Sequence, residues 1–135
     1  MSAASALQTA IFARLSGDAA LTALVGANGI TDRRPDRPAA PLLVIEGIDS
    51  ADHSTASEAG EAHVVTLEAW SEAAGHREVQ AIAAAVRAAL HDAALALAGH
   101  RLVLIFHRDT RLGRDGKSRF HRAHMRFRAV TEPED

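Results

Sequence analysis

Residues 119–130 read RFHRAHMRFRAV, a run in which basic and apolar side chains alternate. Successive side chains of a strand point to opposite faces, so this alternation predicts a strand with one face in the core. The apolar face would hold His121, Ala123, Met125 and Phe127. The other face would carry a basic stripe made of Arg122, His124, Arg126 and Arg128. Such a stripe can neutralise phosphates or meet the carboxylates of a neighbouring surface.

Further strands precede this one along the chain. An Asp-Gly pair within residues 114–117 is a typical hairpin turn and predicts a partner strand at 102–108. Two more strands are predicted at 42–48 and at 63–70, the second with consecutive β-branched residues. The apolar residues between 75 and 95 share one helical face, so this segment is predicted to be a long helix packed on the sheet.

Two helices are predicted before the first strand. In residues 5–15, leucine and isoleucine recur every four positions, which is typical of a helix with one buried face. Asp18 fits the N-cap of a second, short helix that ends at Gly26. The order α-α-β-β-α-β-β predicts an α+β fold in a single domain over residues 1–135. We expect a mostly antiparallel four-stranded sheet packed by one long helix and the N-terminal helices.

Three segments are predicted to lack regular structure. Residues 30–41 are interrupted by prolines, and residues 132–135 form an acidic tail. Residues 49–60 are rich in Ser, Ala, Asp and Glu, so we expect a mobile loop that becomes ordered only against a partner.

Composition excludes several classes of protein. The chain has no cysteine, which excludes disulfides and thiolate chemistry. Its first residues do not form a signal peptide, and its apolar runs are too short to span a bilayer. We therefore expect a soluble cytoplasmic protein with no membrane partner.

Catalytic and ligand-binding motifs fail on their spacing. The Gly-Lys-Ser of residues 116–118 lacks the first glycine and the following helix of a phosphate-binding loop. Neither GxSxG nor HExxH occurs. We therefore predict no catalytic residue, no cofactor and no metal ligand. Two arrangements stay open at this stage, a metal site built from His63, His107 and His124 and a carboxylate pair built from Glu46 and Glu68.

Charge is distributed unevenly along the chain, although the net charge is only −2. Residues 38–76 carry seven acidic side chains and no lysine or arginine, whereas residues 101–128 carry nine basic ones against Asp109 and Asp115. Two solvated faces of different sign would explain the pattern, and so would a head-to-tail contact between identical subunits. For such a contact the expected interface residues are Glu46, Glu61, Glu68, Arg119, Arg122, Arg126 and Arg128.

Several motifs in order along the chain point to one family. They are LQTAIFARL (7–15), DAALTAL (18–24), PLLVI (41–45), TLEAWS (66–71), VRAAL (86–90), GHRLV (99–103) and RFRAVTEP (126–133). Taken together, the chain resembles the tail-completion, or tail-terminator, proteins of long-tailed phages and of phage-like gene transfer agents.

The resemblance implies a structural protein and not an enzyme. It implies a ring, usually a hexamer, that caps the tail tube and joins it to the connector of the head. The implied partners are further copies of the chain, the tail tube protein and the head–tail connector or stopper protein, with DNA passing through the lumen without specific binding. The protein would be cytoplasmic during assembly and would then lie at the head–tail junction of the particle. The alternatives are a small metal-dependent enzyme and a duplex-DNA-binding module that uses the basic C-terminal hairpin.

Overall fold

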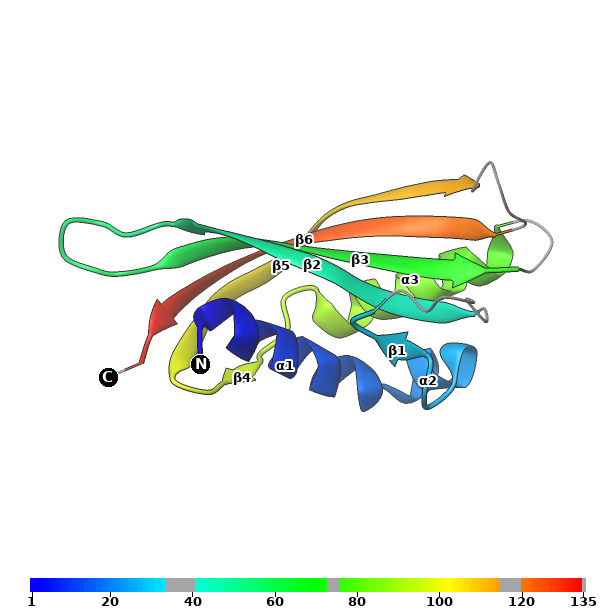
Figure 1. Ribbon diagram of the computed structural model, residues 1–135, viewed down its shortest axis with the longest axis horizontal. Helices are drawn as coiled ribbons and strands as arrows, with labels where there is room; N and C mark the ends of the chain where they lie inside the picture. Colours follow the sequence, from blue (N-terminus) through cyan, green and yellow to red (C-terminus); the bar gives the residue numbers. More distant parts are fainter. Residues whose placement is uncertain (34–40, 73–75, 115–119, 135) are drawn as a thin grey trace.

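The computed structural model describes residues 1–33, 41–72, 76–114 and 120–134. Its helices lie on one side of a single sheet, and no described helix covers the other side (Figure 1). The helices are α1 (Ala3–Ser16), α2 (Ala19–Val25) and α3 (Arg77–Leu90). None of the helices in these described ranges is long and apolar enough to span a membrane.

The sheet has six strands in the order β1-β2-β3-β6-β5-β4. The long strands are β2 (Leu42–Asp52), β3 (Glu61–Ser71), β5 (His100–Arg114) and β6 (His121–Pro133). The edge strands β1 (Ile30–Thr31) and β4 (Ala96–Leu97) have two residues each. All neighbouring strands are antiparallel except β1 and β2, which run parallel. The predicted α+β class, the mostly antiparallel pairing and the four long strands are therefore confirmed. The predicted four-stranded sheet and the order α-α-β-β-α-β-β are wrong, because β1 precedes β2 and β4 precedes β5.

The core lies between the sheet and the helices, and β6 runs through its centre. Along β6, Ala123, Met125, Phe127 and Ala129 are completely buried, and the residues that alternate with them from Arg122 to Arg128 are not. The helices supply the other side of the core with Leu7, Ile11, Leu15, Val79, Ile82 and Val86. The alternation read from the sequence thus places β6 correctly.

Local capping explains where the two N-terminal helices begin and end. The Asp18 carboxylate accepts a hydrogen bond from the Leu21 N–H at 2.9 Å, which is the predicted N-cap of α2. Gly26 ends α2 with a φ of 83°, a conformation that glycine adopts at little cost. The Ser2 hydroxyl caps α1 in the same way, by accepting from the Ser5 N–H at 3.1 Å.

The β2–β3 hairpin is longer than the sequence predicts. Asp52 pairs with Glu61, so only residues 53–60 lie between the strands. The prediction of a mobile loop is wrong for residues 49–52, which belong to β2. The tip is a hydrogen-bonded turn, in which the Thr55 N–H donates to the Glu58 carbonyl at 2.7 Å. Cross-strand backbone hydrogen bonds do not require apolar side chains, and so a polar segment can extend a hairpin.

The C-terminal half also contains more sheet than predicted. Helix α3 ends at Leu90 and not at residue 95, because Asp92 adopts a φ of 58° and donates its N–H to the Ile105 carbonyl on β5. Strand β5 then continues to Arg114, and β6 takes in residues 132–133 of the predicted tail. Of the predicted turn at 114–117, only Arg114 is among the described residues. Of the predicted irregular segment at 30–41, residues 34–40 also lie outside them.

One polar side chain, His63, is buried among the core residues where the hairpin joins the domain. Its exposed fraction is 1%, and its two ring nitrogens contact the hydroxyl of Ser50 at 2.7 Å and the hydroxyl of Thr131 at 2.8 Å. His63 therefore links β2, β3 and β6. Burial lowers the pKa of His63 below its ordinary value, against the opposing effect of the nearby Glu61 carboxylate.

The stability of the protein should therefore fall in acid. In the unfolded chain a histidine takes up a proton near pH 6.5, whereas His63 resists protonation in the fold, so stability is full above that pH and is lost as the pH falls below it. We expect His63→Gln, which does not titrate, to flatten the dependence of the free energy of unfolding on pH between about pH 7.5 and about pH 5. Urea titrations would measure this, with His53→Gln, an exposed residue of the hairpin tip, as control. An unchanged slope in His63→Gln would contradict the assignment.

Candidate functional site

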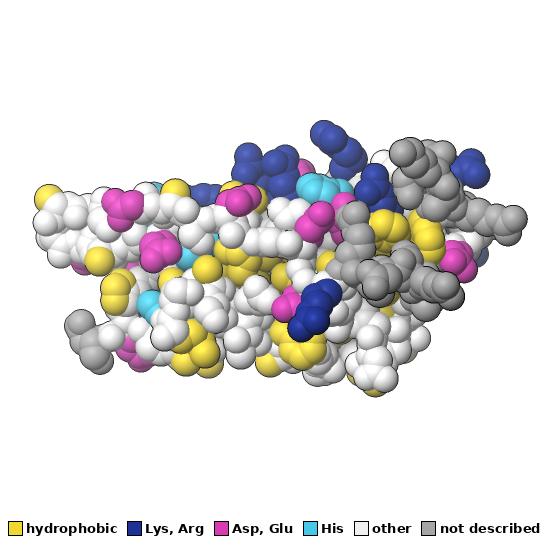
Figure 2. Space-filling model, in the orientation of Figure 1, with side chains coloured by type: hydrophobic (Ala, Val, Ile, Leu, Met, Phe, Trp, Pro, Cys, Tyr) yellow, Lys and Arg dark blue, Asp and Glu magenta, His cyan; other side chains and the backbone are white. Residues whose placement is uncertain are grey.

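The side of the sheet that faces away from the helices is the candidate functional surface, and we call it the open face. Figure 2 shows that arginine side chains gather along it. The strand registers place the following side chains on the open face: Leu42, Val44, Asp49, Val64, Thr66, Glu68, Trp70, Phe106, Asp109, Arg111, Arg122, His124, Arg126 and Arg128. Glu46 joins them, because its carboxylate lies within 4.8 Å of the Glu68 carboxylate and the His124 ring. The predicted basic stripe on β6 is part of this surface.

One end of the open face is covered by a small apolar cluster. Leu42, Val44 and Trp70 are each at most 6% exposed, and Phe120 packs against them. The Trp70 and Phe120 rings meet edge to face with centroids 5.4 Å apart, and the Arg122 guanidinium lies 5.7 Å from the Trp70 ring centre. The Leu-Leu-Val-Ile run at the start of β2 was the available signal, because four consecutive apolar residues are typical of a strand buried on both faces.

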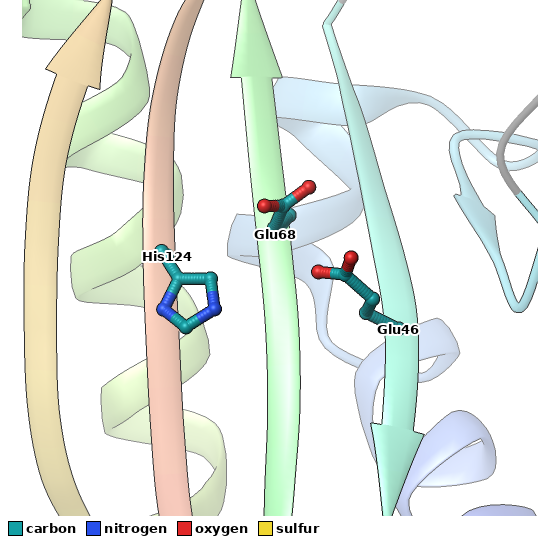
Figure 3. A group of neighbouring side chains, drawn as sticks. All are labelled: Glu46, Glu68 and His124. Carbon is teal, nitrogen blue, oxygen red and sulfur yellow. The ribbon is translucent and has the colours of Figure 1, made fainter.

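Beside this cluster, carboxylates and bases meet within one chain. Glu46, Glu68 and His124 come from three strands, and their ligand-type atoms lie within 4.8 Å of one another (Figure 3). Glu46 stands at the irregularity in the β2–β3 register between Ile45 and Gly47, a bulge that turns its side chain toward Glu68. The Glu68 side chain, only 7% exposed, lies 3.6 Å from the Arg122 guanidinium.

These three side chains have the donor types of a metal site, but the neighbouring charge favours another role. A carboxylate that leaves water needs a compensating positive charge, and Arg122 supplies it to Glu68. We therefore describe this group as an ion-pair network and assign no metal to it. The carboxylate pair left open by the sequence does come together, whereas the three-histidine site does not. His63 and His107 lie on the helix side of the sheet, opposite Ala129 and Phe127, and His124 lies on the open face.

A second ion pair neutralises the middle of the basic stripe. Arg126 donates two hydrogen bonds to the Asp109 carboxylate, from Nε at 3.0 Å and from a terminal nitrogen at 2.6 Å. These bonds hold the pKa of Asp109 below its ordinary value and raise that of Arg126. Arg111 and Arg128 remain exposed on the same face. With two of its arginines already paired to carboxylates, the stripe offers phosphates less positive charge than the sequence suggests.

The expected interface residues do not form two separate fields. Glu46, Glu68, Arg122, Arg126 and Arg128 share the open face, and Glu68 contacts Arg122 within one chain. Glu61 lies at the start of β3, on the side of the sheet that holds His63, and Arg119 is outside the described residues. Their role in subunit contacts stays a prediction.

The two long edges of the sheet are the feature that sequence reasoning missed. Strand β1 pairs only with Leu43 and Val44, and β4 pairs only with His100 and Arg101. The turn after α3 covers β5 somewhat further, since the His107 N–H donates to the His91 ring at 3.0 Å. Within the ranges that the structure describes, residues 46–52 of β2 and 108–114 of β5 therefore have a strand on one side only. Edges depend on strand order, which local patterns do not reveal.

Comparisons with known proteins agree with this architecture. The sequence of residues 9–132 matches the protein family described as tail completion protein gp17. A chain in a solved structure of the virion of a native gene transfer agent particle is 35% identical, with 98% of this chain and 99% of that chain covered and a TM-score of 0.88. Among curated proteins, no sequence matches. The chain belongs to the tail completion protein gp17 family and is a structural protein, not an enzyme.

Proposed function

We propose that this chain is the tail completion subunit of a phage-like particle, such as a gene transfer agent. In this role, copies of the chain close into a hexameric ring that caps the tail tube and joins it to the head connector. The observation that carries the proposal is the likeness, over nearly the full length of both chains, to a chain of a gene transfer agent virion. The subunit is made in the cytoplasm and then becomes part of the head–tail junction.

The two different edges of the sheet suit a ring. A closed ring needs a heterologous contact, in which one surface of a subunit meets a different surface of the next. The sheet has two different edges, one on β2 and one on β5, and a sheet that closes on itself has no exposed edge left. The tail tube protein and the head–tail connector or stopper would bind the two rims of the ring. DNA would pass through the lumen without sequence-specific contacts.

Deleting the gene for this chain from a producing cell tests the proposal. Electron microscopy of the resulting particles is expected to show tails of uncontrolled length, or tails that are not joined to heads. A plasmid copy of the gene should restore joined particles, which controls for effects on neighbouring genes. Normal tails of uniform length joined to heads in the deletion would refute the proposed role.

A further inference from the structure

We propose that neighbouring copies in the ring join edge to edge, with residues 46–52 of β2 in one copy pairing antiparallel with residues 108–114 of β5 in the next. This inference rests on the proposed ring and names the contact that closes it. The backbone N–H and C=O groups along an exposed edge of seven residues can form hydrogen bonds with a strand of another chain. Soluble proteins usually block such edges. Here both edges of the same sheet are left open over equal lengths in the described residues.

The directions of the strands fix the orientation of the contact. Strands β2 and β5 run in opposite directions, because each step through β3 and β6 between them is antiparallel. A second copy placed beside the first, with its open face on the same side, therefore presents its β2 antiparallel to β5. The antiparallel ladder is the more stable of the two types.

Charge selects the register. The β2 edge carries carboxylates at Glu46, Asp49 and Asp52, and the β5 edge carries arginines at Arg108, Arg111 and Arg114. An antiparallel pairing that sets Asp49 against Arg111 brings these opposite charges together, and it also places Asp52 across from Arg108. It places Glu46 across from Arg114, but these two side chains are on opposite faces of the sheet, because Arg114 pairs with His121. The one carboxylate on the β5 edge, Asp109, is held by Arg126 within its own chain.

The faces of the sheet agree with this register at its two central pairs, those of Asp49 and Ile48. Asp49 lies across from Val64, which pairs with Arg128 of the stripe, and Arg111 pairs with His124, so both side chains are on the open face. The same register sets Ile48 against Leu112, and both of these lie on the helix side of the sheet. Leu112, 37% exposed in the single chain, would then gain an apolar neighbour.

The register also offsets each copy along the strand direction. Within one chain, Arg111 of β5 pairs with His124, His124 pairs with Glu68, and Glu68 pairs with Val44 of β2. Arg111 and Val44 therefore lie in one row across the sheet. In the proposed contact Arg111 meets Asp49 of the next copy, which is five positions further along β2 than Val44. A sheet that closes on itself needs a stagger of this kind, because closure requires tilted strands.

Paired cysteines test the contact directly, since the natural chain contains no cysteine. Cross-strand neighbours have Cα atoms about 4.5–5.5 Å apart, which a disulfide can bridge. Particles that carry Asp49→Cys with Arg111→Cys are expected to show disulfide-linked dimers and higher multimers of this chain on a non-reducing gel. Glu58→Cys with Arg111→Cys, which moves one thiol to the hairpin tip, is the matched control and should stay monomeric.

Charge reversal provides a second test that does not depend on disulfide geometry. Asp49→Arg alone, or Arg111→Asp alone, places like charges together in every contact and is expected to lower the yield of joined particles at least about tenfold. The double variant restores opposite charges across the contact and should recover most of that yield. Glu58→Arg and Arg77→Asp, both at exposed positions away from the two edges, are the controls and should keep it. Circular dichroism of each purified variant shows whether the chain still folds.

The outcomes separate this contact from the proposed function. If joined particles contain the double-cysteine chain without disulfide-linked copies, and the single reversals assemble normally, the edge contact is refuted while the tail-completion role stands. If the gene deletion gives normal joined tails, the role itself fails. Recovery by the double reversal, together with the disulfide ladder, would establish the pairing of Asp49 with Arg111.

Discussion

Replacing Phe127 with alanine is expected to remove a large part of the stability of this protein. Phe127 is the largest side chain in the core with no exposed surface, and it lies on β6 between Val65 of β3 and His107 of β5. Its ring also meets the His107 ring edge to face at 5.4 Å. Removing a buried phenylalanine costs about 3–5 kcal/mol, because contacts are lost and the cavity collapses only in part. Domains of this size are stable by only about 5–15 kcal/mol in total.

Chemical denaturation followed by circular dichroism would measure this loss as a lower free energy of unfolding. Phe106→Ala is the matched control, because Phe106 is on the adjacent strand and is 42% exposed. The control should lose much less stability, since its ring already contacts solvent over much of its surface. A loss of less than about 1 kcal/mol in Phe127→Ala would show that β6 is not the central strand of the core.

The importance of Phe127 could be read from the sequence, because it depends on a local alternation. The period of two in residues 119–130 assigns Phe127 to the core face whatever the neighbouring strands are. The N-cap at Asp18 and the helix end at Gly26 are local in the same sense, because a side chain or a backbone angle within one turn determines them. Such features do not depend on the order of the strands in the sheet.

Features that depend on partners far away in the chain could not be predicted. The two residues of β1 have no strand pattern of their own, and they are a strand only because Leu43 and Val44 lie beside them. Residues 49–52 look like a loop in sequence, yet they pair with residues 61–64 across the hairpin. In both cases the backbone supplies the hydrogen bonds, and the side chains give no sign of it.

The candidate site shows the same limit. The basic stripe and the acidic strands were correctly seen in the sequence, but their mutual position was not. Because β3 and β6 are neighbours, Glu68 falls beside Arg122 in a single chain, and the two charge blocks interleave on one face. The edges where opposite charges could meet between copies are those of β2 and β5, which become the outer long strands only through the strand order.

Gly29→Ala is the second substitution for which we expect a large effect. A Cβ on Gly29 would stand 2.0 Å from the Val25 carbonyl oxygen and 2.7 Å from its carbon, and both of these are backbone atoms. The backbone of Gly29 is also fixed on two sides. Its N–H donates to the Gly26 carbonyl at 3.2 Å, and its own carbonyl accepts from the Leu43 N–H at 2.7 Å, where β1 meets β2.

The turn from α2 into β1 must therefore open to admit the methyl group, and opening it weakens the contact with Leu43. Overpacking of this kind costs about 1–3 kcal/mol and occasionally more. Gly47→Ala is the matched control, because a Cβ there meets nothing within 4 Å and Gly47 lies within β2. A glycine within a strand loses more backbone entropy on folding than alanine does, so this variant should be as stable as the natural chain or slightly more stable. Urea denaturation of both variants measures the difference in stability between them. Equal midpoints would mean that Gly29 lies further from Val25 than it does in this structure.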